Sequence, residues 1–144
     1  METKQTRLDS MSYLKQKDPE SIPENDIWMF RYKVDTYYNY GAKLYCEVYV
    51  ISSKTPKGVW IVPTWVRLDD EEDVKKFRRF VRNEGRKRFA HETRALAKHA
   101  FLCRKRRHIG ILKVQLKKAE ESYVIAGGTL PTPTSDRSWY NEYD

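Results

Sequence analysis

The feature that most constrains this chain is a proline-free stretch between Thr93 and the Gly127–Gly128 pair. Thr93 is a suitable helix N-cap, and the paired glycines are typical of a helix stop. The stretch therefore predicts one long helix over about residues 93–126, roughly 50 Å in length at 1.5 Å per residue. Gly110 is its weakest interior position, because glycine costs roughly 1 kcal/mol relative to alanine, so a kink or break there stays open.

Apolar residues in this stretch follow two rows. One row has the alternating 3 and 4 spacing of a coiled-coil seam and predicts a homodimer interface of Ile109, Leu112, Leu116, Ala119 and Tyr123. The other row lies on nearly the opposite side of the helix and contains Leu96, Ala100, Cys103, Ile111, Val114 and Ile125. Two apolar rows need two surfaces to cover them. The seam spans only two heptads, which is short for an independent coiled coil.

The charges are segregated along the chain. The formal net charge is +8, but residues 75–118 hold 17 of the 28 Lys/Arg and only the acids Glu84 and Glu92, which gives +15. The segments before and after this block are net acidic, at −3 and −4. A field of this size suits an anionic partner such as nucleic acid, although lysine and arginine also commonly form a solvated helix face.

Side chains of this basic block would neutralise phosphates and release counterions. The predicted nucleic-acid-binding residues are Arg78, Arg79, Arg82, Arg86, Lys87, Arg88, Arg104, Lys105, Arg106, Arg107, Lys113 and Lys117. Phosphate contacts carry little sequence information, so DNA and RNA fit equally. An acidic protein surface is a third partner that the same charges would attract.

From Ile27 the apolar period changes to two, which predicts three antiparallel strands over residues 27–35, 43–52 and 59–66. Turns are predicted at Asn39–Gly41 and Lys54–Gly58. Pro63 lacks a hydrogen-bond donor, so the third strand should be an edge strand or should end there.

The strands carry two aromatic rows. Trp28, Phe30 and Tyr32 alternate along the first strand, and Tyr45 and Tyr49 along the second. Either row could stack on unpaired bases. We favour the simpler interpretation, in which one row is the core against the long helix.

An acidic run, Asp69–Asp73, precedes basic and apolar residues that extend to Arg82. Acids at the start and bases at the end suit a helix dipole, which predicts a short basic helix. Phe77, Phe80 and Val81 would form its apolar face. Residues 86–90 could add a short strand. The fold class expected is α+β: a three- to four-stranded antiparallel sheet, a short basic helix and a long C-terminal helix.

Residues 26–126 are expected to form a single domain. The polar residues 1–25 contain Pro19 and Pro23 and predict a flexible N-terminal arm. Residues 127–144 predict a flexible tail with an acidic and aromatic end.

No catalytic or cofactor-binding motif is present: GxSxG, HExxH, GxxxxGK[ST] and GxGxxG are all missing. His99 and Cys103 could supply two zinc ligands, which is too few for a site. The acids of Asp69–Asp73 are consecutive and would point in different directions rather than converge on one ion. We therefore expect a protein that is not an enzyme, without metal or cofactor.

Cys46 and Cys103 lack CxxC spacing and are expected to be buried, reduced thiols. The N-terminus has no apolar leader, and no run approaches the length of a membrane span. These features predict a cytoplasmic protein without a membrane partner.

The segment RKRFAHET at Arg86–Thr93, followed by RKRRHIGILKVQL at Arg104–Leu116, resembles a pattern in small, uncharacterised bacteriophage proteins. Those proteins have an aromatic β region and then an RFAYPT-like start of a long basic helix. This chain has His91-Glu92 where Tyr-Pro would be expected, and Arg94 rather than acids in the first turn. The resemblance covers about a quarter of the chain. It implies a phage or mobile-element accessory protein that acts by binding, in the host cytoplasm.

Two hypotheses for function follow. The first is a non-enzymatic accessory protein that binds nucleic acid or another polyanion through its basic helical surface. The alternative is an inhibitor of a host defence or transcription factor, or a structural virion component, in which the basic block covers an acidic surface. A nucleotide held between subunits is a further possibility.

Overall fold

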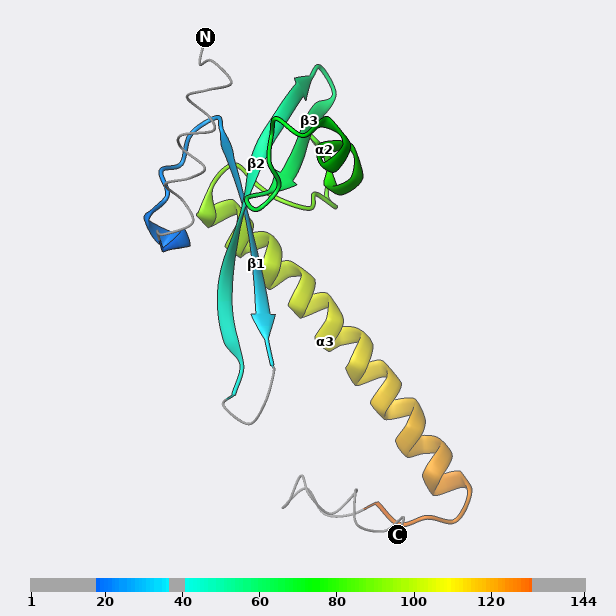
Figure 1. The fold of residues 1–144 in the computed structure, drawn as a ribbon. Coiled ribbons are helices and arrows are strands. Elements are labelled where there is room, and N and C mark those ends of the chain that lie inside the picture. Colours follow the sequence, from blue (N-terminus) through cyan, green and yellow to red (C-terminus); the bar gives the residue numbers. More distant parts are fainter. Residues whose placement is uncertain (1–17, 37–40, 131–144) are drawn as a thin grey trace. The chain divides into compact units, whose positions relative to one another are not determined.

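The computed structural model describes residues 18–36 and 41–130. Its elements are η1 (Pro19–Ser21), β1 (Trp28–Asp35), β2 (Lys43–Thr55), β3 (Gly58–Pro63), α2 (Glu71–Phe77), β4 (Arg79–Arg82) and α3 (Arg94–Ile125) (Figure 1). The chain divides into two compact units, Met1–Leu102 and Cys103–Asp144. The helix α3 begins in the first unit and ends in the second.

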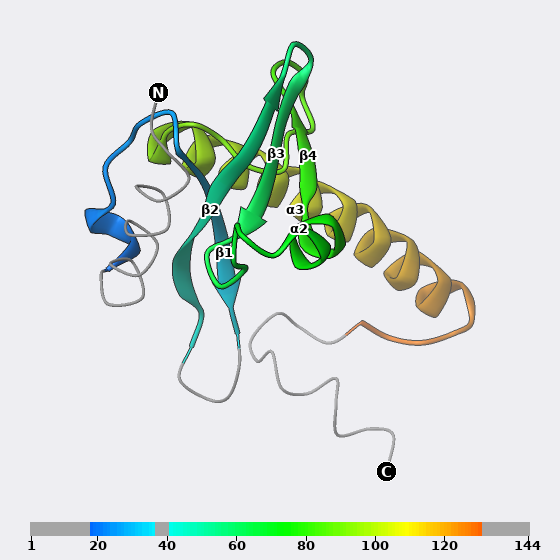
Figure 2. The same ribbon diagram turned by 45° about the horizontal axis from the view of Figure 1, so that its top comes forward.

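The four strands form one antiparallel sheet in the order β1-β2-β3-β4 (Figure 2). This confirms the α+β class with a four-stranded sheet and a long C-terminal helix. The strand β3 ends at Pro63, as the missing donor of proline predicts. Gly58 begins it where no side chain fits, because a Cβ there would lie 2.2 Å from the carbonyl oxygen of Val81.

Both faces of the sheet are covered. On one face Trp28, Phe30 and Tyr32 form a core with Val50 and with Ala97 of α3. On the other face a separate cluster contains Met29, Ile51, Ile61, Val81 and Ala90. Because successive side chains of a strand point to opposite faces, both sets alternate along β1. The aromatic row of β1 is therefore core against the first turns of α3, the interpretation that the sequence favoured.

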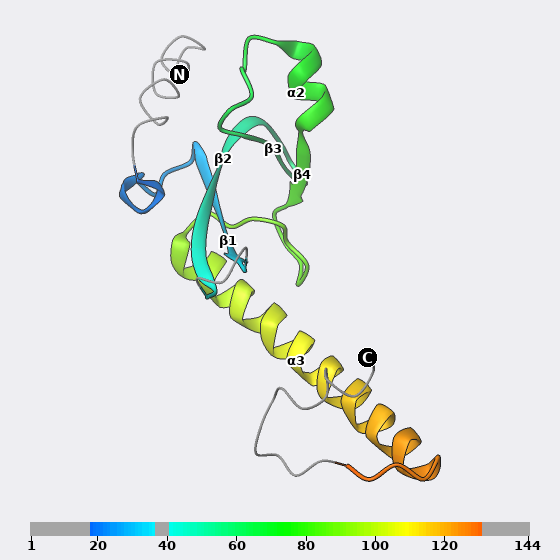
Figure 3. The same cartoon turned by 60° about the horizontal axis from the view of Figure 1, so that its bottom comes forward.

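The prediction of a short basic helix that extends to Arg82 is wrong for the second half of that segment. The helix α2 starts after Asp70, whose side chain accepts hydrogen bonds from the amides of Glu72 and Asp73 at 3.1 Å, and it ends at Phe77. Residues Arg79–Arg82 then form β4, directly after α2 (Figure 3). Residues 79–82 form a strand rather than a continuation of the helix because pairing with β3 buries Val81 fully beside Val59. A helical turn would not place Val81 there.

Residues 86–90 do not form the short strand that was considered. Ala90 instead packs into the core on one face of the sheet, and the next residue, His91, forms an isolated bridge with Phe30, in which the amide and carbonyl groups exchange hydrogen bonds of 2.7 and 2.9 Å. This bridge fixes the chain at the outer edge of β1, just before α3 begins.

The ends of α3 agree with the sequence. The amide of Leu96 donates to Oγ1 of Thr93 at 3.2 Å, so Thr93 is the N-cap. At the other end the amides of Gly127 and Gly128 donate to the carbonyls of Val124 and Tyr123, with φ at Gly127 of 95°, which is a Schellman motif. The helix continues through Gly110 as one element.

The flexible arm expected over residues 1–25 is not what residues 18–25 form. Ile22 is 3% exposed and belongs to the core of the first unit. Tyr32 donates from its hydroxyl to Glu20 at 3.0 Å, and Glu24 accepts from the amide of Arg94 at 3.0 Å. These contacts make the segment part of the fold. The remainder of the arm (residues 1–17), Asn39–Tyr40 of the predicted turn, and residues 131–144 of the tail lie outside the described residues.

Candidate nucleic-acid interface

The predicted binding residues fall in both units. Arg78, Arg79, Arg82, Arg86, Lys87 and Arg88 belong to the first unit, and Arg104, Lys105, Arg106, Arg107, Lys113 and Lys117 to the second. All are exposed except Arg88, which is partly covered. The block that is continuous in sequence is therefore carried by two structural units.

Within the first unit the strand β4 separates the arginines. Arg79 shares a face of the sheet with Val81, whereas Arg82 shares the opposite face with Phe80, because side chains alternate along a strand. Arg78, at the end of α2, lies with its Cζ 4.3 Å from the centre of the Trp60 ring. The structure therefore does not bring these three arginines together on one surface.

Arg88 has a structural partner. Its side chain is 13% exposed and forms a bidentate ion pair with Glu92. Burial alone would raise the pKa of the Glu92 carboxyl, but the hydrogen bond from Arg88, a backbone hydrogen bond and the charge of Arg88 outweigh it, and the pKa lies below its ordinary value. Of the predicted binding residues, Arg88 is thus the one that the protein neutralises with its own acid in a partly buried position.

One predicted residue, Arg79, joins a cluster that the sequence did not indicate. The Cζ atoms of Arg79 and Arg31 each lie 3.9 Å from the centre of the Phe89 ring. Tyr49 meets the same ring edge-on, with 5.3 Å between ring centres. Arg31 was missed because it lies in β1, outside the basic block. Its only sequence signal is its place on the strand face opposite Phe30.

The hydroxyl of Tyr49 donates to Glu47 at 3.0 Å, and Glu47 also pairs with Lys33. Burial first, and then the charge of Glu47 and the hydrogen bond to it, raise the pKa of Tyr49 to about 12, whereas Arg31 and Arg79 act in the opposite direction. Tyr49 therefore stays protonated and neutral at neutral pH. It does not offset the positive charges of Arg31 and Arg79.

In the second unit, residues 102–119 of α3 are exposed all around the helix. They contain seven Lys/Arg and no acid. Arg104–Arg107 are consecutive and spread around the helix at about 100° per residue, whereas Arg106, Lys113 and Lys117 follow one line along it. Lys117 pairs with Glu121 at 4.0 Å, an exposed i,i+4 contact. The helix thus presents one basic line and further bases on other sides.

The predicted seam is exposed within this chain. Ile109, Leu112 and Leu116 are 52%, 49% and 58% exposed, Ala119 is exposed and Tyr123 is partly covered. Large apolar side chains of the second row, including Ile111 and Val114, are exposed as well. The described residues of the second unit offer these side chains no cover.

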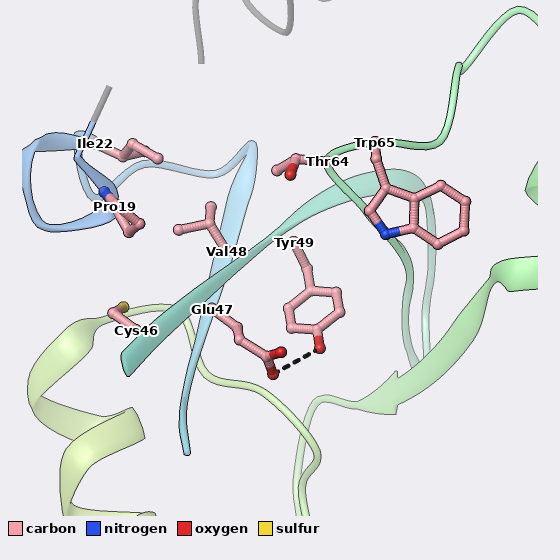
Figure 4. A pocket seen from close by; sticks show the side chains of 8 residues that line it. All are labelled: Pro19, Ile22, Cys46, Glu47, Val48, Tyr49, Thr64 and Trp65. Carbon is pink, nitrogen blue, oxygen red and sulfur yellow. Dashed lines mark hydrogen bonds between the residues drawn. The ribbon is translucent and has the colours of Figure 1, made fainter. Parts of the chain in front are cut away.

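A separate pocket of about 260 Å³ lies in the first unit between η1 and the turn after β3 (Figure 4). It is lined by Pro19, Ile22, Cys46, Glu47, Val48, Tyr49, Thr64 and Trp65. Burial and the charge of Glu20 raise the pKa of the Cys46 thiol, so this thiol is protonated and poorly nucleophilic. The pocket therefore holds no activated cysteine.

The two cysteines differ. Cys46 is buried as expected, but Cys103 is exposed, which corrects the expectation that both are buried. Cys103 lies where α3 leaves the packed part of the first unit, so the second apolar row to which it belongs has no core to enter. In the part of the chain that the structure describes, no three His, Cys, Asp or Glu side chains gather as metal ligands would.

Comparisons of the chain with protein-family models, with curated proteins and with solved structures found no match. Over residues 18–36 and 41–130, no helix has the length and apolar character needed to cross a membrane. The class of protein that the fold itself defines is an α+β domain whose four-stranded antiparallel sheet leads into one long helix.

Proposed function

We propose that the protein is a non-enzymatic accessory protein that binds nucleic acid through the exposed part of α3. One observation carries the proposal: residues 102–119 form a helical surface with seven Lys/Arg and no acid, exposed on every side. Such a surface presents a high density of positive charge to the solvent. Its lysines and arginines would neutralise phosphates of a nucleic acid and release the cations condensed on that nucleic acid, which gives affinity without sequence readout.

The apolar seam supports a dimeric form of this helix. Ile109, Leu112 and Leu116 need a cover, and a second copy offers the same stripe in the same heptad register. Arg106 and Lys113 flank the seam at heptad positions next to it, and Lys117 lies farther round the helix, so pairing would place these bases along the edge of the paired helices. A dimer would place two basic helices side by side on one polyanion.

The alternative is a protein-binding role, as an inhibitor of a host factor or as a virion component of a phage or mobile element. It is favoured by the same exposed apolar side chains, because a helix with both apolar and basic residues also fits an acidic protein groove. Salt dependence separates the two roles, since binding to nucleic acid releases counterions from a polyanion.

Fluorescence anisotropy of labelled duplex and single-stranded oligonucleotides across a salt series tests the proposal. We expect binding in low salt, with a slope of log affinity on log salt steeper than about −3. The triple variant Arg106→Gln/Lys113→Gln/Lys117→Gln should weaken binding and flatten the slope. Its control is Lys54→Gln/Lys57→Gln/Arg67→Gln, which removes the same charge from exposed positions of the first unit. Absence of binding at low salt, or equal effects of both triples, would contradict the helical site.

A further inference from the structure

Some basic side chains of the first unit form ion pairs with its acids, and others do not. Acids of the same unit pair with one set, which consists of Lys33, Lys54, Arg67, Arg88 and Arg94. Arg31 and Arg79 differ: among residues 18–36 and 41–130, no carboxylate lies within 4.0 Å of either guanidinium. They are also brought together, which like charges resist.

The convergence requires both edges of the sheet. Arg31 lies on β1 and Arg79 on β4, which are separated by two intervening strands and therefore by roughly 14 Å at about 4.8 Å per strand. Both side chains nevertheless reach the Phe89 ring at 3.9 Å, so their Cζ atoms are at most twice that distance apart. Cation–π attraction to Phe89 holds each guanidinium over the face of the sheet.

The acid nearest in register does not neutralise them. Glu47 lies directly opposite Arg31 in the β1–β2 pairing, yet its carboxylate pairs with Lys33 and accepts from the Tyr49 hydroxyl. Arg31, Arg79, Lys33 and Glu47 together carry a net charge of +2. Arg79 is exposed and Arg31 partly exposed, so an anion from solution can reach the pair.

We propose that Arg31 and Arg79, positioned by Phe89, form a binding site for a phosphate group. Guanidinium groups match phosphate oxygens through charge-assisted hydrogen bonds of about 2.8 Å, and an anion bound beside them would offset the mutual repulsion of the two positive charges. The source we assign is a phosphodiester of a nucleic-acid strand, and this assignment of the source rests on the proposed function. The site lies in the first unit and needs no residue of the basic helix.

The test is a titration of the full chain, followed by NMR signals of the arginine Nε–Hε groups. Three probes are used at constant ionic strength: inorganic phosphate, thymidine monophosphate and a ten-nucleotide thymidylate strand. We expect the strand to shift the Arg31 and Arg79 signals with at least tenfold higher affinity than either small probe. Equal affinity for all three would overturn the nucleic-acid assignment, and no shift with any probe would overturn the site.

Variants sharpen the result. Arg31→Gln and Arg79→Gln should each reduce affinity for the strand at least fivefold, and the double variant should lose more than either single variant, because each guanidinium can donate to the phosphodiester. Arg67→Gln is the matched control: it removes one charge from an exposed arginine that pairs with Asp69, and it should change affinity less than twofold. Glu47→Gln should raise affinity, since it removes the only carboxylate of the cluster.

Folding and the helical site are controlled separately. Arg79 is exposed, so Arg79→Gln keeps the test valid even where Arg31→Gln destabilises the sheet. The helical triple variant should leave the phosphate-induced shifts of Arg31 and Arg79 unchanged. If the helical triple leaves strand affinity unchanged while the Arg31 and Arg79 signals still shift, the helical proposal fails and this one stands. If the strand binds but neither signal shifts, this proposal fails and the helical one stands. Loss of the shifts in the helical variant would contradict an independent site.

Discussion

The first turns of α3 and the remainder of the same helix are made of similar residues but have opposite surroundings. Ala97 is 1% exposed and packs with Phe101 against the sheet, whereas Leu116 is 58% exposed. The difference teaches that the sequence encodes two tasks within one helix. The first turns complete a core, and the later turns leave apolar and basic side chains exposed.

The charges repeat this contrast. Arg94, in the first turn, is 17% exposed and is held by Glu20, Glu24 and the carbonyls of Pro19 and Ile22. Beyond it, the next acid of the helix is Glu120. In proteins most helical stability comes from tertiary packing, so the packed first turns support a helix whose later turns are exposed.

The largest effect should come from breaking the packed end. Ala97→Asp would bury a carboxylate in the core of the first unit without a partner, and we expect it to lower the free energy of unfolding by about 3–5 kcal/mol. Chemical denaturation followed by tryptophan fluorescence measures this. Ala95→Asp is the matched control, because Ala95 is exposed in the same turn and an acid suits the start of a helix. Comparable losses in both variants would show that Ala97 is not core.

The exposed end should respond in the opposite manner. Leu112→Glu/Leu116→Glu should weaken self-association at least a hundredfold, because it places charges on the seam, while the unfolding of the first unit changes by less than about 0.5 kcal/mol. Sedimentation velocity over a range of concentrations reads out the association. Ile111→Glu/Val114→Glu, on the other apolar row, is the control. Dimers that persist in the seam variant would exclude this interface.

Removing the anchor charge should cost less than damaging the core. Arg94→Met keeps most of the side-chain volume but leaves the carbonyls of Pro19 and Ile22 without their donor. We expect a loss of about 2 kcal/mol in unfolding free energy. Hydrogen exchange of the amides in residues 19–24 should accelerate as this segment loosens. Unchanged protection there would mean that the core contact of Ile22 suffices.

The smallest effect concerns pH. The folded pKa of Glu92 lies below its ordinary value of 4.5, so the carboxylate contributes stability that is present above pH 4.5 and is lost as pH falls through the lowered pKa. Glu92→Gln should therefore flatten the acidic limb of a plot of stability against pH. Arg88→Met should flatten it in the same way, since it removes the partner. If both variants keep the acidic limb of the wild-type protein, the Arg88–Glu92 pair does not contribute to the pH dependence of stability.

Much of the fold was predictable because its signals are local. Period-two alternation indicated the strands from Trp28 onward, Pro63 marked a strand end, and Thr93 and Gly127 marked the ends of α3. The strand β4 was missed because Phe77, Phe80 and Val81 also fit a helical spacing, and only burial beside Val59 decides between the two.

The candidate sites were less predictable, because they depend on contacts between distant segments. Phe89 and Arg31 meet through the sheet topology, which no local pattern reports. The pairing of Arg88 with Glu92 was open to sequence reasoning as an i,i+4 contact, but its burial was not. Cys103 was expected to be buried because free cysteines usually are, and its position on α3 leaves it exposed instead.

The hydrogen bonds of Arg94 to residues 19–24 have a consequence for the order of assembly. They join positions 70 to 75 residues apart in sequence, so residues 19–24 cannot complete their contacts until the start of α3 has been synthesised. Contacts of such long range are entropically costly to close before other structure exists. On the ribosome, the hairpin of β1 and β2 can form early, but the N-terminal segment should lock only after the start of α3 has left the exit tunnel.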